Sequence, residues 1–154
     1  MRTGGIIRKG PERELVDDYM ARARHLSRNF GISQIQEQQI DLRQAKTRRA
    51  ETELLLPPLD DKTTNHYIIL DERGKALKSR EIARRIAGFR DEGYRQVSFV
   101  IGGADGFEPD ALPTSVTRWS FGPQTWPHKM VRVMLAEQIY RALSILASTP
   151  YHRD

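Results

Sequence analysis

Three short apolar segments alternate with helix-like segments in the second half of the chain, and this alternation is the strongest constraint on the fold. The apolar segments are residues 66–70, 97–101 and 118–121, each of the length of a buried strand. Residues 79–91 and 130–147 carry apolar side chains at helical spacing. Strands that alternate with helices form parallel sheets, because each parallel connection needs a crossover. The sequence therefore predicts an α/β fold with a parallel sheet flanked by helices.

The remaining segments have weaker patterns. We interpret residues 1–8 and 32–42 as short strands, and residues 11–30, 51–56 and 109–116 as helices. The connections are predicted from local chemistry, as a charged loop at residues 71–75, a helix N-cap at Ser79, a helix end at Pro57 and Pro58, and a polar tail at residues 149–154. No internal repeat or linker is evident, so residues 1–154 are expected to form a single domain.

The charge balance favours a polyanionic partner such as RNA. Lysine and arginine outnumber aspartate and glutamate by 25 to 20, which gives a formal net charge of +5. Lys46, Arg48 and Arg49 form a basic cluster that either contacts RNA or is a solvated helix face.

Several classes of protein are excluded or disfavoured by what the sequence lacks. It has no cysteine, which removes disulfides and thiolate chemistry and is typical of a reducing compartment. It contains no Ser-His-Asp triad pattern, no paired metal ligands and no phosphate-binding loop with glycine, lysine and serine. Arg132, Glu137 and Arg141 interrupt the most apolar helix, so a membrane span is not expected. We expect a cytoplasmic protein.

A glycine-rich segment follows the strand predicted at residues 97–101. Residues 102–106 read Gly-Gly-Ala-Asp-Gly, which allows a backbone to approach a ligand closely at the carboxyl end of a sheet. A dinucleotide fingerprint starting at Gly102 would need two further glycines, but Ala104 and Phe107 occupy those positions. The segment is therefore either a ligand-binding loop of another kind or a plain tight turn.

A second irregular segment covers residues 121–128. One glycine and two prolines prevent its backbone from pairing in a β-sheet. Its N–H and carbonyl groups are therefore available to bind the edge of an adenine ring or to make hydrogen bonds within the protein. Trp126 either lines a pocket or belongs to the core. His128 lies four residues before Arg132, so the two share a helix face if the helix begins near Pro127. Considered alone, these two are a helix-start residue and a surface charge.

The end of the chain concentrates polar groups. Glu137 and Arg141 have the spacing of an ordinary helical ion pair. Tyr151 has a ring that can stack on a base, His152 has a titratable imidazole, and Arg153 has a guanidinium group that can bind phosphate. Composition does not decide whether this tail is ordered.

Taken together, these segments resemble the family of ribosomal RNA large-subunit methyltransferase H, a pseudouridine N3-methyltransferase of the SPOUT class. The resemblance runs from about residue 66 to the end, and its motifs are residues 70–75, 99–106, 125–128, 131–132, 136–142 and 150–153. It weakens at the amino end, where the family begins with a more apolar strand than residues 1–8. The first strand is therefore expected to be frayed or weakly paired.

The resemblance implies a SPOUT trefoil-knot fold, a homodimer, and S-adenosylmethionine as methyl donor for 23S ribosomal RNA on the assembled ribosome. It implies no metal, no membrane and no DNA. The residues expected to contact the cofactor are Leu70, Gly102, Gly103, Phe121, Gly122, Pro123, Gln124, Thr125 and Trp126.

Five residues are expected to contribute to catalysis, namely His152, Arg153, Tyr151, Arg141 and His128. N3 of pseudouridine must lose a proton as it attacks the methyl carbon, so a general base is needed. His152, His128 and water are the alternatives for that base, while the arginines could hold phosphate or stabilise an oxyanion. The runner-up functions are a SPOUT methyltransferase for another RNA, such as tRNA, and a catalytically silent ribosome-binding factor.

Overall fold

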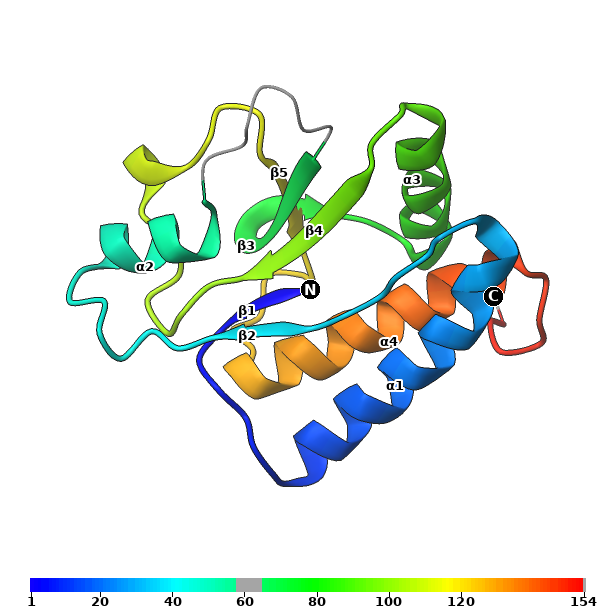
Figure 1. The fold of residues 1–154 in the computed structure, drawn as a ribbon, viewed down its shortest axis with the longest axis horizontal. Coiled ribbons are helices and arrows are strands. Elements are labelled where there is room, and N and C mark those ends of the chain that lie inside the picture. The colour runs from blue at the N-terminus through cyan, green and yellow to red at the C-terminus, as the bar shows by residue number, and fades with distance from the viewer. Residues whose placement is uncertain (58–64, 154) are drawn as a thin grey trace.

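The computed structural model describes residues 1–57 and 65–153 of the chain (Figure 1). It contains one five-stranded sheet with the order β2-β1-β4-β3-β5, in which every neighbouring pair is parallel. The strands are β1 (Arg2–Gly4), β2 (Gln38–Ile40), β3 (Asn65–Ala76), β4 (Gln96–Ile101) and β5 (Thr117–Ser120). The helices are α1 (Pro11–Ser27), α2 (Arg48–Leu55), α3 (Ser79–Asp91) and α4 (His128–Leu146), with 3₁₀ turns η1 (Arg28–Phe30) and η2 (Pro109–Ala111). The predicted α/β fold with a parallel sheet flanked by helices is confirmed.

The sheet has a core on each face, which explains why its strands are continuous apolar runs rather than alternating ones. Ile68 of β3 packs in the cluster formed with α1, α3 and α4, whereas its neighbour Ile69 packs in the cluster formed with α2. Figure 1 shows the same layers, with α1, α3 and α4 on one side of the sheet and α2 on the other. Both isoleucines are fully buried.

The predicted charged loop at residues 71–75 is wrong, because these residues continue β3. The strand curls over β5, so that both Leu70 and Lys75 pair with Trp119. Gly74 permits the close approach, since a Cβ atom there would lie 2.5 Å from the carbonyl carbon of Trp119. Pairing with a distant strand thus overrides the loop-like local composition.

The expectation of a frayed first strand is also wrong. β1 lies inside the sheet, paired with β2 on one side and with β4 on the other. Thr3, at its centre, is fully buried. A strand with two neighbours gains hydrogen bonds on both edges, so its glycine-rich sequence does not make it an edge.

Two helix predictions need correction. The helix predicted at residues 109–116 is only the short turn η2, Pro109–Ala111. Ser79 is the first residue of α3 rather than its N-cap; Lys78 is the cap, and its N–H donates to Glu81 Oε2 at 2.8 Å. The Ser79 hydroxyl instead donates to Gln138 Oε1 at 3.0 Å, which joins α3 to α4.

The other elements agree with the predictions within a few residues at their ends, although the strand predicted at residues 32–42 is reduced to Gln38–Ile40. Pro58, predicted to end α2, and Asp154, in the predicted tail, lie outside the described residues.

Candidate functional site

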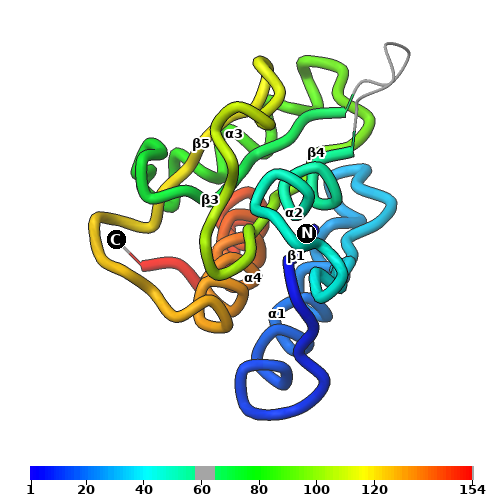
Figure 2. Tube along the Cα trace, turned by 90° about the vertical axis from the view of Figure 1, so that its left-hand side faces the viewer, coloured from blue at the N-terminus to red at the C-terminus, as the bar shows by residue number. Residues whose placement is uncertain are grey.

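The carboxyl ends of β4 and β5 lie beside the middle of β3, at one edge of the sheet. Leu70 of β3 pairs with Ile101 of β4 and with Trp119 of β5. Because the strands are parallel, the residues that follow them leave the sheet on the same side. Figure 2 looks at the side of Figure 1 on which β4 ends and α4 begins. The predicted cofactor residues from β3 and from the segments after β4 and β5 are therefore brought to a common edge.

The segment after β4 folds into a closed turn. The N–H of Gly106 donates to the carbonyl of Gly103 at 3.2 Å, and Gly106 has a φ of 71°. A Cβ atom on Gly102 would lie 3.3 Å from the Gly106 backbone, and one on Gly103 would lie 2.5 Å from Oε2 of Glu51. The glycines thus allow close packing within the turn, and the carboxylate of Glu51, on α2, lies over it.

The segment after β5 is held at its start and exposed at its centre. The Ser120 hydroxyl donates to the carbonyl of Gly122 at 3.0 Å and accepts from its N–H at 3.1 Å, while Gly122 has a φ of 109°. Trp126 is 41% exposed, so its interpretation as a core residue is wrong; Trp119 fills the core instead. Among residues 1–57 and 65–153, no hydrogen bond involves the main chain of residues 124–126.

His128 joins the first turn of α4 to the glycine turn. Its Nε2 lies 2.7 Å from the carbonyl oxygen of Gly102. A carbonyl oxygen only accepts, so Nε2 carries the ring hydrogen. Burial is the main cause that lowers the pKa of His128 below its ordinary value, with Arg132 acting in the same direction. His128 therefore stays neutral at physiological pH and fixes the position of Gly102.

Arg132 lies one turn further along the same face of α4, as its spacing from His128 predicted. It is not a surface charge, because only 1% of its side chain is exposed. Its Nη2 donates to the carbonyl oxygens of Gly4 and Gly5, the latter at 2.7 Å. Burial lowers the pKa of Arg132, and the nearby Glu37 opposes that effect. Arg132 thus ties α4 to the end of β1.

A second polar cluster lies in the later half of α4. Glu137 Oε1 accepts from Nη2 of Arg141 at 2.6 Å and from the hydroxyl of Tyr151 at 3.0 Å. The Arg141 guanidinium lies 4.8 Å from the centre of the Tyr151 ring, which also packs at a tilt of 59° against the Tyr140 ring, with 4.6 Å between the ring centres. The predicted Glu137–Arg141 ion pair is confirmed, and it also anchors the tail.

Contacts of Tyr151 and His152 hold the tail against α4. Nη1 of Arg141 lies 3.3 Å from Nδ1 of His152, and since a guanidinium only donates, Nδ1 accepts and Nε2 carries the ring hydrogen. Burial, together with hydrogen bonds to Tyr19 and Glu137, raises the pKa of Tyr151. Arg153 is exposed.

The predicted site residues form two separate groups within one chain. Glu137, to which the tail is anchored, follows His128 by nine residues of helix, or about 13 Å at 1.5 Å per residue. Figure 1 shows the C-terminus beside the far end of α4, away from its first turn. The strand-end loops and the tail are therefore not brought together by a single subunit.

Three residues of this arrangement were missed from the sequence. Glu51, over Gly103, and Glu37, beside Arg132, lie far along the chain from their partners, and no spacing pattern links them. Ser120 precedes the predicted loop directly, and a serine two residues before a glycine could have indicated the turn that it makes.

The basic cluster predicted at Lys46, Arg48 and Arg49 is exposed, and it is partly neutralised. Arg48 pairs with Glu108 at 3.0 Å and Arg49 with Glu53 at 3.8 Å. These pairs favour the solvated helix face over RNA contact.

In the described part of the chain, no group of three or more His, Cys, Asp or Glu side chains could hold a metal ion. No described helix is long and apolar enough to cross a membrane.

Parallel α/β sheets commonly bind ligands in the loops at the carboxyl edge of the sheet. Comparison with known proteins identifies the class of enzyme. Residues 3–152 match the family model described as "Predicted SPOUT methyltransferase". Three similar proteins bear the name ribosomal RNA large subunit methyltransferase H. They come from Maricaulis maris (52% identical, 97% of this chain and 95% of that protein), Phenylobacterium zucineum (45%, with 97% and 95%) and Caulobacter sp. (41%, with 99% and 96%).

The chain therefore belongs to the SPOUT methyltransferases, within the family of ribosomal RNA large-subunit methyltransferase H. This confirms the resemblance found in the sequence and the class of fold that it implied. A methyltransferase of this kind needs a methyl donor.

Proposed function

We propose that this protein transfers the methyl group of S-adenosylmethionine to N3 of a pseudouridine in 23S ribosomal RNA, acting in the cytoplasm on the assembled ribosome. The observation that carries the proposal is the near full-length match to proteins named for large-subunit ribosomal RNA methylation. Those names favour ribosomal RNA over tRNA as the substrate, and they favour an enzyme over a silent binding factor.

The loops at the sheet edge fit the cofactor in three respects. The main chain of residues 124–126 makes no hydrogen bond to the described residues, so its N–H and carbonyl groups suit the edge of an adenine ring. Trp126 supplies an exposed aromatic face beside them. The turn at Gly102 and Gly103 brings backbone close without side chains, next to Leu70, the last residue of β3 that pairs with β4. We assign cofactor binding to these residues and to Phe121, Gly122 and Pro123 between them.

When bound, S-adenosylmethionine supplies a methyl carbon attached to a positively charged sulfur. The chain must orient N3 of the base toward that carbon and exclude other geometries. In the balanced reaction the new bond is N3 to carbon, the broken bond is carbon to sulfur, and the N3 proton leaves to a base or to water. No net charge is left on the sulfur.

The protonation states limit which residue takes that proton. Tyr151, with its raised pKa, remains a hydrogen-bond donor at neutral pH. Nε2 of His128 is held by the Gly102 carbonyl, which makes His128 a positioning residue for the cofactor turn. Nδ1 of His152 accepts from Arg141, so that nitrogen is not open to take a proton from the base. This arrangement favours water as the proton acceptor.

The separation of the tail from the strand-end loops supports a homodimeric active site. Tyr151, His152 and Arg153 would reach the cofactor loops of a second subunit rather than their own. The last helix offers little apolar surface for such a dimer, because the apolar residues of α4 are largely buried against α1 and α3. The dimer is therefore proposed on the geometry of the two groups.

The function is tested in two steps. Mass spectrometry of 23S ribosomal RNA from a deletion strain should show loss of one methylated pseudouridine, with tRNA unchanged. Single-turnover reactions should then be faster on ribosomes than on separate subunits or protein-free RNA, because phosphate contacts on a small basic chain position RNA without reading its sequence. Loss of a methyl group from tRNA, or unaltered RNA of both kinds, would refute the proposal.

A further inference from the structure

A basic hollow of about 500 Å³ lies at the same sheet edge as the cofactor loops, beside β1 and β2. Four cationic side chains line it, from Arg8, Lys9, Arg43 and Lys129, together with one carboxylate, Asp41. All four cationic residues are exposed. None of them has a place in the methyl-transfer site described above.

Most of the positive charge of this hollow is uncompensated. Asp41 is bound by Arg43 at 2.5 Å, and that contact is the main cause that lowers the pKa of Asp41 to about 2. Arg8 is close enough to lower it further. No ion pair with Arg8, Lys9 or Lys129 is found among residues 1–57 and 65–153. Like charges gathered without partners are a cost to the fold unless an anion neutralises them.

The hollow adjoins the cofactor turn. Leu42 lines it, and the Cδ1 atom of Leu42 would lie 3.2 Å from a Cβ atom on Gly103 and 2.7 Å from one on Gly4. Lys129 also lines it and directly follows His128, which binds Gly102. In Figure 1, β1, β2 and β4 end on the side where α4 begins. An anion in the hollow would thus lie next to the proposed methyl-transfer site.

We propose that this hollow binds a backbone phosphate of the RNA substrate beside the target nucleotide. The inference rests on the proposed function, which it extends by naming a substrate contact. Lysine and arginine on an open surface suit a phosphodiester, since such contacts need charge rather than a closed pocket. A free phosphate has the same chemistry, so the two sources must be separated by experiment.

A second hollow in the described part of the chain, of about 640 Å³, is less suited to this role. It is lined by apolar residues of α3, α4 and β4 such as Phe89, Leu143 and Val97, with Arg2, Arg90 and Arg95 among them. It lies at the other end of β4, where the strand begins. The phosphate site is therefore assigned to the basic hollow.

The test compares two variants that each remove two positive charges from exposed positions. The first is Arg8→Gln with Lys9→Gln, and the matched control is Arg84→Gln with Arg85→Gln on α3. Binding of protein-free 23S ribosomal RNA is measured over about 50 to 200 mM salt. The first variant should bind roughly tenfold more weakly, with a log–log salt slope shallower by about one to two. The control should stay close to wild type.

Both variants should bind S-adenosylmethionine as the wild type does, and the first should show a raised KM for ribosomes with little change in kcat. Equal RNA binding by the two variants would overturn the inference. So would unchanged RNA binding in the first variant while inorganic phosphate still titrates the hollow by NMR, since that result would indicate a free-anion site. RNA binding can be measured without methyl transfer. If the wild type is inactive but its RNA binding depends on Arg8 and Lys9, the proposed function is refuted and the phosphate site is retained.

Discussion

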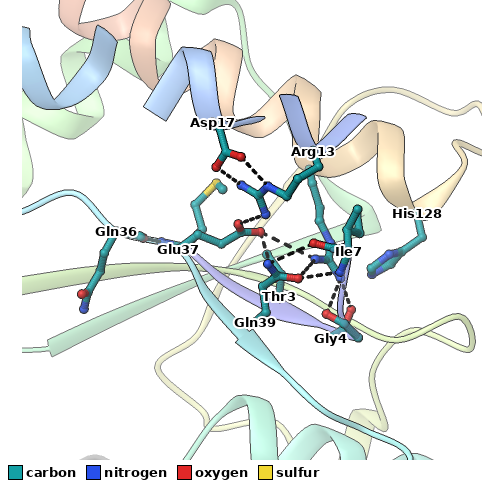
Figure 3. Close-up of polar contacts among 12 residues, drawn as sticks. Thr3, Gly4, Ile7, Arg13, Asp17, Gln36, Glu37, Gln39 and His128 are labelled. Atoms are coloured by element: carbon teal, nitrogen blue, oxygen red, sulfur yellow. Dashed lines mark hydrogen bonds and ion pairs between the residues drawn. The ribbon is translucent and has the colours of Figure 1, made fainter. Parts of the chain in front are cut away.

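Arg132 in α4 and Glu37, just before β2, form a buried ion pair that joins the last helix to the first strands of the sheet. Nη1 of Arg132 lies 3.6 Å from Oε1 of Glu37, and their side chains are 1% and 7% exposed. Arg13 donates to Oε2 of the same carboxylate at 2.5 Å, and Thr3 donates to Oε1 at 3.2 Å. In Figure 3 the carboxylate of Glu37 points toward Arg13 and Thr3, with His128 beside this network. The carboxylate of Glu37 thus contacts two guanidinium groups close to the proposed site, and Arg13 has a second partner in Asp17.

Replacing Glu37 by glutamine should lower the free energy of unfolding by about 3–5 kcal/mol, because a buried guanidinium would lose its counter-charge. Urea unfolding measures this change. Asp17→Asn is the matched control, since Asp17 binds the same Arg13 at 2.7 Å but is 67% exposed. That variant should lose less than about 1 kcal/mol. Equal losses of unfolding free energy in both variants would show that the buried ion pair stabilises the fold no more than the exposed one.

The fold was predictable where a local pattern decides the structure. Residues 97–101 form a short apolar run and residues 130–147 carry apolar side chains at helical spacing, and the strand and helix predicted there correspond to β4 and α4. Residues 71–75 were not predictable, because their charged composition is typical of a loop while their structure depends on Trp119, more than forty residues away. Long-range strand pairing of this kind cannot be predicted from a short segment of sequence.

The site was predictable only in its contiguous parts. The shared face of His128 and Arg132 follows from their spacing in a helix. The burial of Arg132 does not, because its partners Gly4 and Glu37 are about a hundred residues away in the chain. The assignment of cofactor and catalytic residues stays a prediction, and the following experiments address it.

Gly103→Val should weaken S-adenosylmethionine binding by at least about tenfold while the protein stays folded. A Cβ atom at this position would already lie 2.5 Å from Oε2 of Glu51, a flexible side chain that can move into the cofactor edge. Gly88→Ala in α3 is the control, because its Cβ atom would meet nothing closer than 3.7 Å. Calorimetry that finds unchanged affinity in folded Gly103→Val would remove the cofactor from this turn.

His128 should make the protein less stable in acid. Its folded-state pKa lies below the unfolded value of about 6.5, so the unfolded state takes up a proton first as the pH falls. The stability that neutral His128 contributes is therefore present above pH 6.5 and is lost as the pH falls through the lower folded pKa. His128→Gln, whose amide can donate to Gly102, should show a smaller decrease between about pH 7.5 and pH 5. Parallel pH profiles of unfolding for the two proteins would contradict this account.

The protein should sediment as a dimer at micromolar concentration, with twice the chain mass of 17.7 kDa. The reason is the distance within one subunit between the tail anchored at Glu137 and the turn held by His128. A second subunit allows two complete sites by symmetry. A monomeric mass in a fully active sample would exclude this arrangement.

Replacing His152 and Arg153 by alanine should reduce single-turnover methylation of ribosomes by more than about a hundredfold while cofactor affinity changes little. The tail lies away from the strand-end loops of its own subunit, so its loss should affect the transfer step rather than cofactor binding. Tyr151→Phe, which removes the hydrogen bond to Glu137, should give a smaller loss by loosening the tail. Parallel losses of methylation and cofactor affinity would place the tail in the cofactor pocket instead.

The same double variant provides a test of which subunit supplies the tail. At a cofactor concentration well below the dissociation constant of Gly103→Val, both variants should have little activity alone. If the tail completes the site of the other subunit, subunit exchange between equal amounts of the two should restore roughly a quarter of wild-type activity, because half of the dimers are mixed and each has one intact site. If the tail acts within its own subunit, a mixed dimer contains no intact site and activity stays absent. Recovery after exchange therefore supports the composite site, and its absence, with exchange verified by mass spectrometry, rules it out.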